Sequence, residues 1–278
     1  MCVGGQLKIM NKKSILFLVC HYTPEKVRRE YIEREWQKQP EHARFNLQFI
    51  AEHDKEQPHV ALSYCYDEKM YRKMIALIKD LQVGYWLGLN VFSTASFNSC
   101  VEWHKSKNTT LDQDFQTYPW LNAGPLSPAE VSLIWKHREA WKRIADSDVE
   151  YAIVAEDDII FSQSSLTYLV DLMDNLPPNA EYADIGGGVG WFVPRIGNTC
   201  VNKCFFEIVP PKTRSTCAAV LTRSFVRSLV DLNLPICLGS DWMLNYAFTR
   251  LNTKVYWVEP AVFGHGSMMR LYDSLITK

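Results

Sequence analysis

The sequence has neither an excess of positive charge nor a long apolar run. Its 30 lysines and arginines are balanced by 31 aspartates and glutamates, for a formal net charge of -1 at pH 7. Proteins that bind nucleic acid usually carry a basic excess that neutralises phosphates, so nucleic acid is not expected as a partner. The longest apolar run near the N-terminus, Ile15 to Cys20, is far shorter than the roughly 20 residues of a membrane-spanning helix. We therefore expect no transmembrane segment.

The eight cysteines show no paired CxxC spacing. This disfavours a zinc module and a disulfide-stapled fold, and most of the cysteines are expected to be reduced. Cys200 and Cys204 are close enough in sequence to form half of a metal site, but no second half is visible. Residues 1–13 lack the apolar stretch of a secretory signal and are expected to be disordered. These features favour a cytoplasmic protein, with a peripheral position at the inner membrane face as an alternative.

What the sequence does contain is the composition of a globular protein. Hydrophobic residues make up 47% and charged residues 22% of its 278 residues, which fits a single domain over residues 1–278. Aromatic residues, at 13% and including nine tryptophans, are more numerous than a core requires. Such amphipathic rings often line sites for flat or sugar-like ligands.

Strand-like and helix-like segments alternate along most of the chain. This order predicts an α/β fold with a mostly parallel central sheet flanked by helices. The expected strands are Ser14–Cys20, Phe45–Ala51, Glu150–Phe161, Ala183–Gly186, one beginning at Cys217, and Lys254–Val258. The expected helices are Glu25–Gln39, Asp67–Leu81, Ser127–Ala145, Ser164–Leu176, one ending at Leu232 and one ending at Arg250. Ser93–Pro128 shows no periodicity and is expected to be a long irregular insertion or an acceptor loop.

Two of the expected helices carry particular signals. In the first helix, Val27, Tyr31 and Trp36 provide an inner stripe at near-helical spacing. The helix that follows residue 126 begins with Ser127 and Glu130, which form a capping-box pattern.

Three consecutive acids, Glu156, Asp157 and Asp158, end an apolar strand. Adjacent carboxylates repel one another and lose hydration there unless a cation compensates them. In an extended backbone Glu156 and Asp158 share a face, so both could reach one Mg²⁺ or Mn²⁺ ion. The alternative interpretation is a solvated acidic turn that precedes a helix.

The helix before the acidic triplet carries a histidine on its apolar face. His137 shares that face with Ile134 and Trp141 and is expected to be buried. Two interpretations remain open. His137 is either a core histidine bonded to backbone or a histidine that supports the groups at the end of the next strand.

Three positions later in the chain could join the same site. Gly187 lies in a glycine-rich stretch without a phosphate-loop motif, which indicates either close backbone approach to a ligand or a simple turn. Asp241 stands at an expected helix start, where it either interacts with the helix dipole or serves as a general base. His265 lies between two glycines, and their small size leaves its imidazole accessible to a metal ion.

The stretch Leu126 to Phe161 resembles the core of family 25 glycosyltransferases of the lipooligosaccharide galactosyltransferase type. In that family a helix start containing Glu is followed by a His and a Trp, and then by an apolar strand that ends in Glu-Asp-Asp. This sequence has Glu130, His137, Trp141 and Glu156–Asp158 in that order. It departs from the family in having Lys before the His, where Ser is usual.

The resemblance implies a GT-A-like, Rossmann-type fold that binds a nucleotide sugar. It further implies a UDP-sugar donor carrying galactose or another hexose, Mn²⁺ or Mg²⁺, a glycan acceptor that can be lipid-linked, and inversion at the anomeric carbon. Asp241 would be the catalytic base, and the metal would be held by Asp158, Glu156 and His265. The donor-binding residues would be Tyr22, Arg28, His137, Glu156, Asp157 and Gly187.

Two rival functions remain open at this point. A nucleotidyltransferase would also use a carboxylate-bound metal, but it would need a basic clamp on the triphosphate, and the sequence shows no Lys/Arg cluster near the acids. A non-catalytic sugar- or nucleotide-binding protein would keep the fold and bind the donor without releasing a nucleoside diphosphate.

Overall fold

The computed structural model describes residues 14–62, 126–188, 193, 200–209, 211–232, 236 and 238–275. Three expectations lie outside the described residues, namely those for residues 1–13, for the helix Asp67–Leu81 and for the irregular insertion up to residue 125. Within the described ranges, no helix is both long and apolar enough to cross a membrane.

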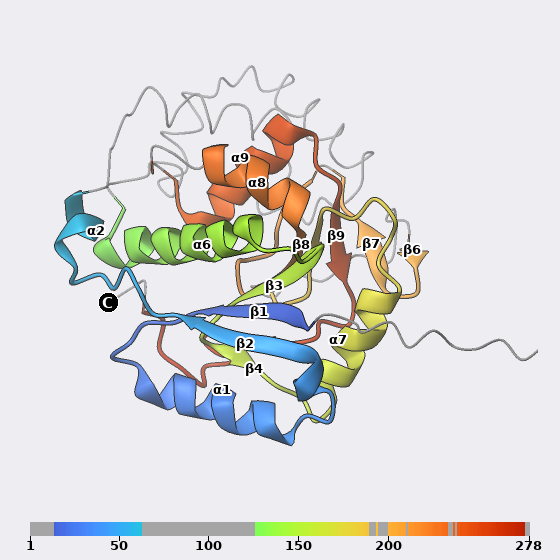
Figure 1. Ribbon diagram of the computed structural model, residues 1–278, viewed down its shortest axis with the longest axis horizontal. Coiled ribbons are helices and arrows are strands. Elements are labelled where there is room, and N and C mark those ends of the chain that lie inside the picture. Colours follow the sequence, from blue (N-terminus) through green and yellow to red (C-terminus); the bar gives the residue numbers. More distant parts are fainter. Residues whose placement is uncertain are drawn as a thin grey trace, which may run out of the picture.

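An eight-stranded sheet runs through the described part of the chain, in the order β2-β1-β3-β8-β5-β9-β7-β6 (Figure 1). Its strands are β1 (Ile15–Cys20), β2 (Phe45–Ile50), β3 (Tyr151–Glu156), β5 (Tyr182–Asp184), β6 (Cys200–Asn202), β7 (Phe205–Glu207), β8 (Ala218–Thr222) and β9 (Val255–Val258). β1 pairs in parallel with β2 and β3, and β5 pairs in parallel with β9. The pairs β3–β8, β5–β8, β7–β9 and β6–β7 are antiparallel.

The expected α/β class is confirmed, and the sheet is mixed in its pairing. Most of the described strands point in one direction, whereas β7 and β8 run against them. The chain enters β8 from the edge at which β3 ends, because the N–H of Glu156 donates to the carbonyl of Cys217, 2.8 Å away. The residues just before β8 therefore lie at the same edge of the sheet as the acidic triplet.

Helices cover both faces of the sheet (Figure 1). One face carries α1 (Lys26–Lys38) and α7 (Ser165–Asp174), and the other carries α6 (Pro128–Asp146), α8 (Arg223–Leu232) and α9 (Ser240–Leu251). Successive side chains of a strand point to opposite faces. Phe17 and Val19 of β1 therefore pack in the core under α1 and α7, while Leu16 and Leu18 pack in the core under the other three helices.

Local sequence signals account for the start of α6 but not for the buried face of α1. The capping box of α6 is confirmed, because Ser127 and Glu130 each accept a backbone N–H from the other, at 3.2 and 2.7 Å. The inner stripe expected for α1 was wrong in part. Val27 is 67% exposed, and the helix instead buries Arg28 and Ile32 beside Trp36. A buried arginine is tolerated at this position because a carboxylate meets it, as described below.

Small elements complete the described chain. They are the single turn η1 (His42–Arg44), the short helix α2 (Pro58–Leu62), and the strands β4 (Ile159–Ile160) and β10 (Gly264–His265). β10 pairs antiparallel with β4, so that His265 lies opposite Ile159. Because Ile159 directly follows the acidic triplet, this register brings a histidine from the C-terminal part of the chain next to Asp158.

Candidate functional site

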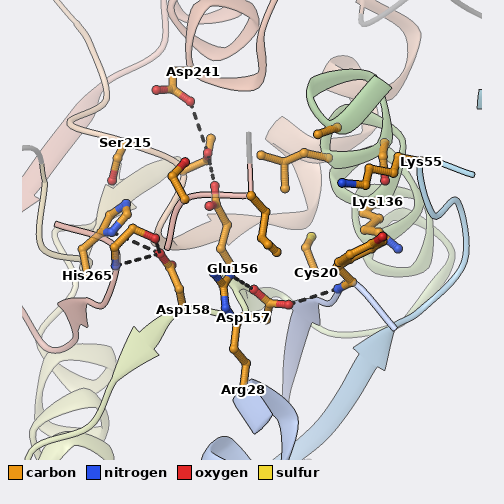
Figure 2. A pocket seen from close by; sticks show the side chains of 18 of the residues that line it. Cys20, Arg28, Lys55, Lys136, Glu156, Asp157, Asp158, Ser215, Asp241 and His265 are labelled. Carbon is orange, nitrogen blue, oxygen red and sulfur yellow. Dashed lines mark hydrogen bonds and ion pairs between the residues drawn. The ribbon is translucent and has the colours of Figure 1, made fainter. Parts of the chain in front are cut away.

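A cavity of about 320 Å³ lies at the edge of the sheet where β1 and β3 end (Figure 2). This is the edge at which α/β sheets usually bind ligands, and the volume suits a small-molecule site. The predicted site residues that line the cavity are Tyr22, Arg28, Glu156, Asp157, Asp158, Asp241 and His265. His137 and Gly187 do not line it.

Asp157 is fully engaged by protein groups. Its Oδ1 accepts from Arg28 at 2.8 Å, and its Oδ2 accepts from the N–H of Tyr22 at 3.0 Å and lies 2.9 Å from His21 Nδ1. Burial disfavours the charged carboxylate, but His21, Arg28 and this N–H outweigh it and hold the pKa of Asp157 below its usual value. Asp157 therefore anchors α1 and the end of β1 to the end of β3.

Arg28 and Tyr22, predicted to bind the donor, both make contacts within the protein. The second amino group of Arg28 donates to the carbonyl of Asp273 at 2.6 Å, and the hydroxyl of Tyr22 donates to Glu56. Both side chains still form part of the cavity wall.

Glu156 lies between a hydroxyl and an imidazole. Its Oε1 accepts from Thr216 Oγ1 and lies 3.7 Å from Nε2 of the buried His137. Burial alone would raise the pKa of Glu156, yet His137 and Thr216 keep it below the usual value. In return, Cys20 and Glu156 raise the pKa of His137 above its usual value, although burial acts in the opposite direction. His137 therefore supports the site from behind Glu156.

Asp241, in the first turn of α9, lies on the same side of the cavity as Glu156 (Figure 2), and the hydroxyl of Thr216 lies between the two carboxylates. Asp241 Oδ1 accepts from Ser240 Oγ at 3.2 Å and lies 3.2 Å from Thr216 Oγ1, whose proton goes to the closer Glu156. Burial and the negative charge of Glu156 raise the pKa of Asp241. A carboxylate with a raised pKa holds a proton more strongly than a free one, which suits a group that must accept a proton.

Asp158 meets His265 on the other side of the cavity. Its Oδ2 accepts from the hydroxyl of Ser267 at 2.6 Å and lies 3.2 Å from His265 Nδ1. Burial and the Glu156 charge raise the pKa of Asp158. Its Oδ1 is buried and has no hydrogen-bond partner in the described part of the chain. A buried, unpaired carboxylate oxygen next to an imidazole fits a divalent cation.

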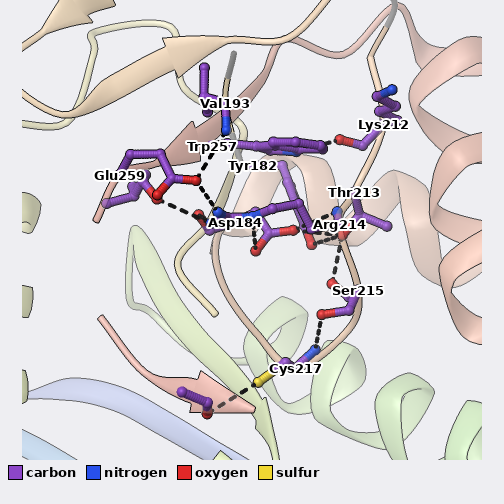
Figure 3. A network of polar contacts seen from close by, with 12 residues as sticks. Tyr182, Asp184, Val193, Lys212, Thr213, Arg214, Ser215, Cys217, Trp257 and Glu259 are labelled. Atoms are coloured by element: carbon purple, nitrogen blue, oxygen red, sulfur yellow. Dashed lines mark hydrogen bonds and ion pairs between the residues drawn. The ribbon is translucent and has the colours of Figure 1, made fainter. Parts of the chain in front are cut away.

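The segment before β8 is held in place by a buried arginine (Figure 3). The backbone N–H of Arg214 donates to Asp184 Oδ2 at 2.8 Å, and its guanidinium donates to Glu259 Oε1 at 2.6 Å. These contacts fix Arg214 to β5 and to the residue after β9. They position Thr216 and Cys217, which follow it, against the acidic triplet.

Gly187 approaches the protein's own backbone. Its N–H donates to the carbonyl of Phe263 at 2.7 Å, and a Cβ on Gly187 would lie 3.3 Å from the amide nitrogen of His265. Gly187 is thus packed closely against the loop that carries His265, an arrangement that neither of the two interpretations of the glycine-rich stretch named.

Sequence reasoning missed several groups at the site. Cys20, Lys136, Thr216 and Ser267 line the cavity, and Cys217 lies beside Asp158 and His265. Thr216 and Cys217 carry no motif, and the reversed direction of β8 that places them here cannot be read from the sequence. Lys136 pairs with Asp54, with Nζ and Oδ1 2.7 Å apart.

Neighbouring carboxylates whose charges shift one another's pKa, at this edge of an α/β sheet, are typical of an enzyme site for a charged ligand. The chain belongs to glycosyltransferase family 25, described as LPS biosynthesis protein, whose family model matches residues 17–190, more than half of the chain. The protein is therefore a glycosyltransferase, with a sugar donor and a glycan acceptor as substrates. A comparison with curated proteins gives no match. The matched range ends before Thr216, Asp241 and His265, so the family match does not cover these residues, and it is the structure that brings them to the site.

Proposed function

We propose that the protein transfers a hexose, such as galactose, from a UDP-sugar to a hydroxyl group of a glycan acceptor in LPS biosynthesis, with inversion at the anomeric carbon. The observation that carries this proposal is the position of Asp241, which lines the same cavity as the acidic triplet. The part of the wall that carries the acidic triplet thus offers groups for a charged donor, and the part that carries Asp241 offers a base.

Asp158 and His265 are the residues that would hold Mn²⁺ or Mg²⁺. The unpaired Oδ1 of Asp158 and the 3.2 Å separation between its Oδ2 and His265 Nδ1 support this assignment. When bound, a divalent cation neutralises the charge that develops on the departing nucleoside diphosphate. Glu156, included in the metal set from the sequence, is proposed instead to orient Thr216, because its Oε1 already accepts the Thr216 hydroxyl.

Asp241 is proposed to accept the proton of the acceptor hydroxyl as its oxygen attacks the anomeric carbon. The new C–O bond forms on the face opposite the breaking bond to the diphosphate, which inverts the configuration. Ser240 donates a hydrogen bond to Oδ1 of Asp241, and Thr216 Oγ1 lies 3.2 Å from the same oxygen, so the other carboxylate oxygen can face the acceptor. A positioned base contributes roughly 10² to 10⁴ to the rate.

A panel of nucleotide sugars tests the proposal. The purified protein is incubated with each donor, with and without Mn²⁺, and with a glycan acceptor, and released nucleoside diphosphate is measured together with the anomeric configuration of the product. We expect release from a UDP-hexose that depends on the cation and increases with acceptor. Release that proceeds equally in a chelator, or a product that retains the donor configuration, would contradict the proposal.

A further inference from the structure

We propose that the sulfur of Cys217 is the third protein ligand of the cation at Asp158 and His265, and that the site therefore prefers a thiophilic transition-metal ion to Mg²⁺. This inference rests on the cation of the proposed function and specifies which ion it is. Cys217 lies outside the matched family range and carries no motif in the sequence.

The three side chains bring their ligand atoms to one place. One atom from each of Asp158, Cys217 and His265 lies within 4.8 Å of the other two. The separation of 3.2 Å between Asp158 Oδ2 and His265 Nδ1 is close to the edge of about 3.3 Å that a tetrahedral ion with bonds near 2.0–2.1 Å requires. With a metal–sulfur bond near 2.3 Å, the edges to sulfur would be about 3.6 Å. Small side-chain movements would close the remaining difference.

Of these groups, one oxygen of Asp158 and the sulfur of Cys217 are the least engaged, whereas Asp158 Oδ2 accepts from Ser267 and His265 Nδ1 accepts from the N–H of Met268 at 3.4 Å. Asp158 is 3% exposed, and its buried Oδ1 has no hydrogen-bond partner among the described residues. Cys217 is fully buried, and its Sγ makes a long 3.8 Å contact with the carbonyl oxygen of Gly264 (Figure 3). A weak thiol donor at this distance contributes little, so an ion at the sulfur would displace no strong hydrogen bond.

The fold holds the three ligands independently. Asp158 follows β3, Cys217 precedes the reversed strand β8, and His265 belongs to β10. A glycine makes room for the cysteine, because a Cβ on Gly186 would lie 3.1 Å from the sulfur of Cys217 and 2.7 Å from the backbone nitrogen that follows it. Ligands fixed by separate elements are already oriented before an ion arrives.

The donor set itself points to a class of ion. Oxygen, nitrogen and thiolate sulfur together suit Zn²⁺, Co²⁺ and similar ions, whereas Mg²⁺ prefers six oxygens in octahedral geometry. Three protein ligands leave a coordination position open, as in catalytic rather than structural zinc sites. A diphosphate oxygen of the donor would fit that position. Coordination releases the thiol proton to solvent.

Cobalt titration of the full-length, metal-stripped protein tests the inference directly. A cobalt–thiolate bond gives a near-ultraviolet charge-transfer band, which oxygen and nitrogen ligands alone do not produce. We expect this band in the wild type, its loss in Cys217→Ser, and its retention in Cys20→Ser, a matched change of a second buried cysteine, which lines the cavity. Calorimetry should show that Cys217→Ser lowers the affinity for Co²⁺ by about tenfold or more. Loss of a residue that only supports a metal ligand already lowers metal affinity by about 10- to 100-fold.

The outcomes separate this inference from the proposed function. If Co²⁺ binds the wild type without a thiolate band and Asp158→Asn abolishes this binding, the role of Cys217 is overturned and the cation site stands. Absence of any cation binding would overturn both. If Cys217→Ser fails to fold, X-ray absorption of the zinc-loaded wild type decides the question, because a sulfur neighbour at about 2.3 Å supports the inference and its absence overturns it.

Discussion

The hydroxyl of Thr216 lies between two carboxylates and has only one proton to donate. It contacts Glu156 Oε1 closely and Asp241 Oδ1 at 3.2 Å. The pKa values of the two acids are shifted in opposite directions. His137 and Thr216 lower the pKa of Glu156 against the effect of burial, whereas burial and Glu156 raise the pKa of Asp241. Two carboxylates with opposite shifts in one cavity are typical of acids with different tasks.

Asp241→Asn should leave donor binding nearly unchanged and lower turnover by roughly 10² to 10⁴. The amide keeps the shape of the side chain and can still accept from Ser240, but it cannot accept the acceptor's proton. Steady-state turnover and calorimetric titration with the UDP-sugar measure the two effects. Near-wild-type turnover with the true acceptor would show that another group is the base.

Asp158→Asn should abolish cation binding and at the same time stabilise the cation-free protein. Burial and the Glu156 charge raise the pKa of Asp158, so its ionised form costs free energy in the folded state at neutral pH. The neutral amide removes this cost and can still accept from Ser267. We expect a gain of about 1 kcal/mol, or roughly 2–4 °C in Tm, by thermal unfolding in a chelator. A lower Tm would mean that the charge of Asp158 stabilises the fold.

At the scale of elements, the Arg28–Asp157 pair ties α1 to the end of β3. Both side chains are buried, with Arg28 Nη1 and Asp157 Oδ1 2.8 Å apart. Removal of one partner from a buried pair leaves an uncompensated charge and usually costs about 3–5 kcal/mol. The pair therefore fixes the position of the helix and also one wall of the cavity.

Asp157→Asn should destabilise the protein most at neutral pH. The pKa of Asp157 is lower in the folded state than its ordinary value of 3.8, so its contribution is present above that value and is lost as the pH falls through the folded pKa. We expect the difference in unfolding free energy between wild type and mutant to shrink below about pH 4. Urea unfolding at a series of pH values measures it. A difference that stays constant across the acid range would exclude a charged Asp157 as the cause.

Elements with strong local signals could be predicted from the sequence, and the site only in part. The capping box at Ser127, the apolar strand β1 and the burial of His137 follow from spacing and side-chain type. Val27 was misplaced because a helix pattern does not reveal that Arg28 has a buried carboxylate partner. The hairpin of β6 and β7 was missed because its strands are short and its exposed positions break the alternation. In both cases the outcome depends on contacts with residues outside the local sequence pattern.

At the scale of the whole molecule, the cavity joins the two ends of the described chain. Tyr22 and Arg28 come from the first βα unit, and Ser274 and Leu275 from the last described residues. Arg28 links the two, because its guanidinium donates to the carbonyl of Asp273. Among the described residues, neither core cluster contains a residue beyond Phe263. The C-terminal segment therefore belongs to the site rather than to the core.

A chain truncated after Ser267 should remain folded and lose affinity for the UDP-sugar. The truncation keeps His265 and the hydroxyl that contacts Asp158, but it removes the cavity wall formed by Met268, Ser274 and Leu275. We expect the far-ultraviolet circular dichroism to be retained and Tm to fall by only a few degrees, since each 1 kcal/mol costs roughly 2–4 °C in a domain of this size. Calorimetry with the donor should show binding at least tenfold weaker, a loss of about 1.4 kcal/mol. Wild-type affinity in the truncated chain would mean that Met268, Ser274 and Leu275 line the cavity without contacting the donor.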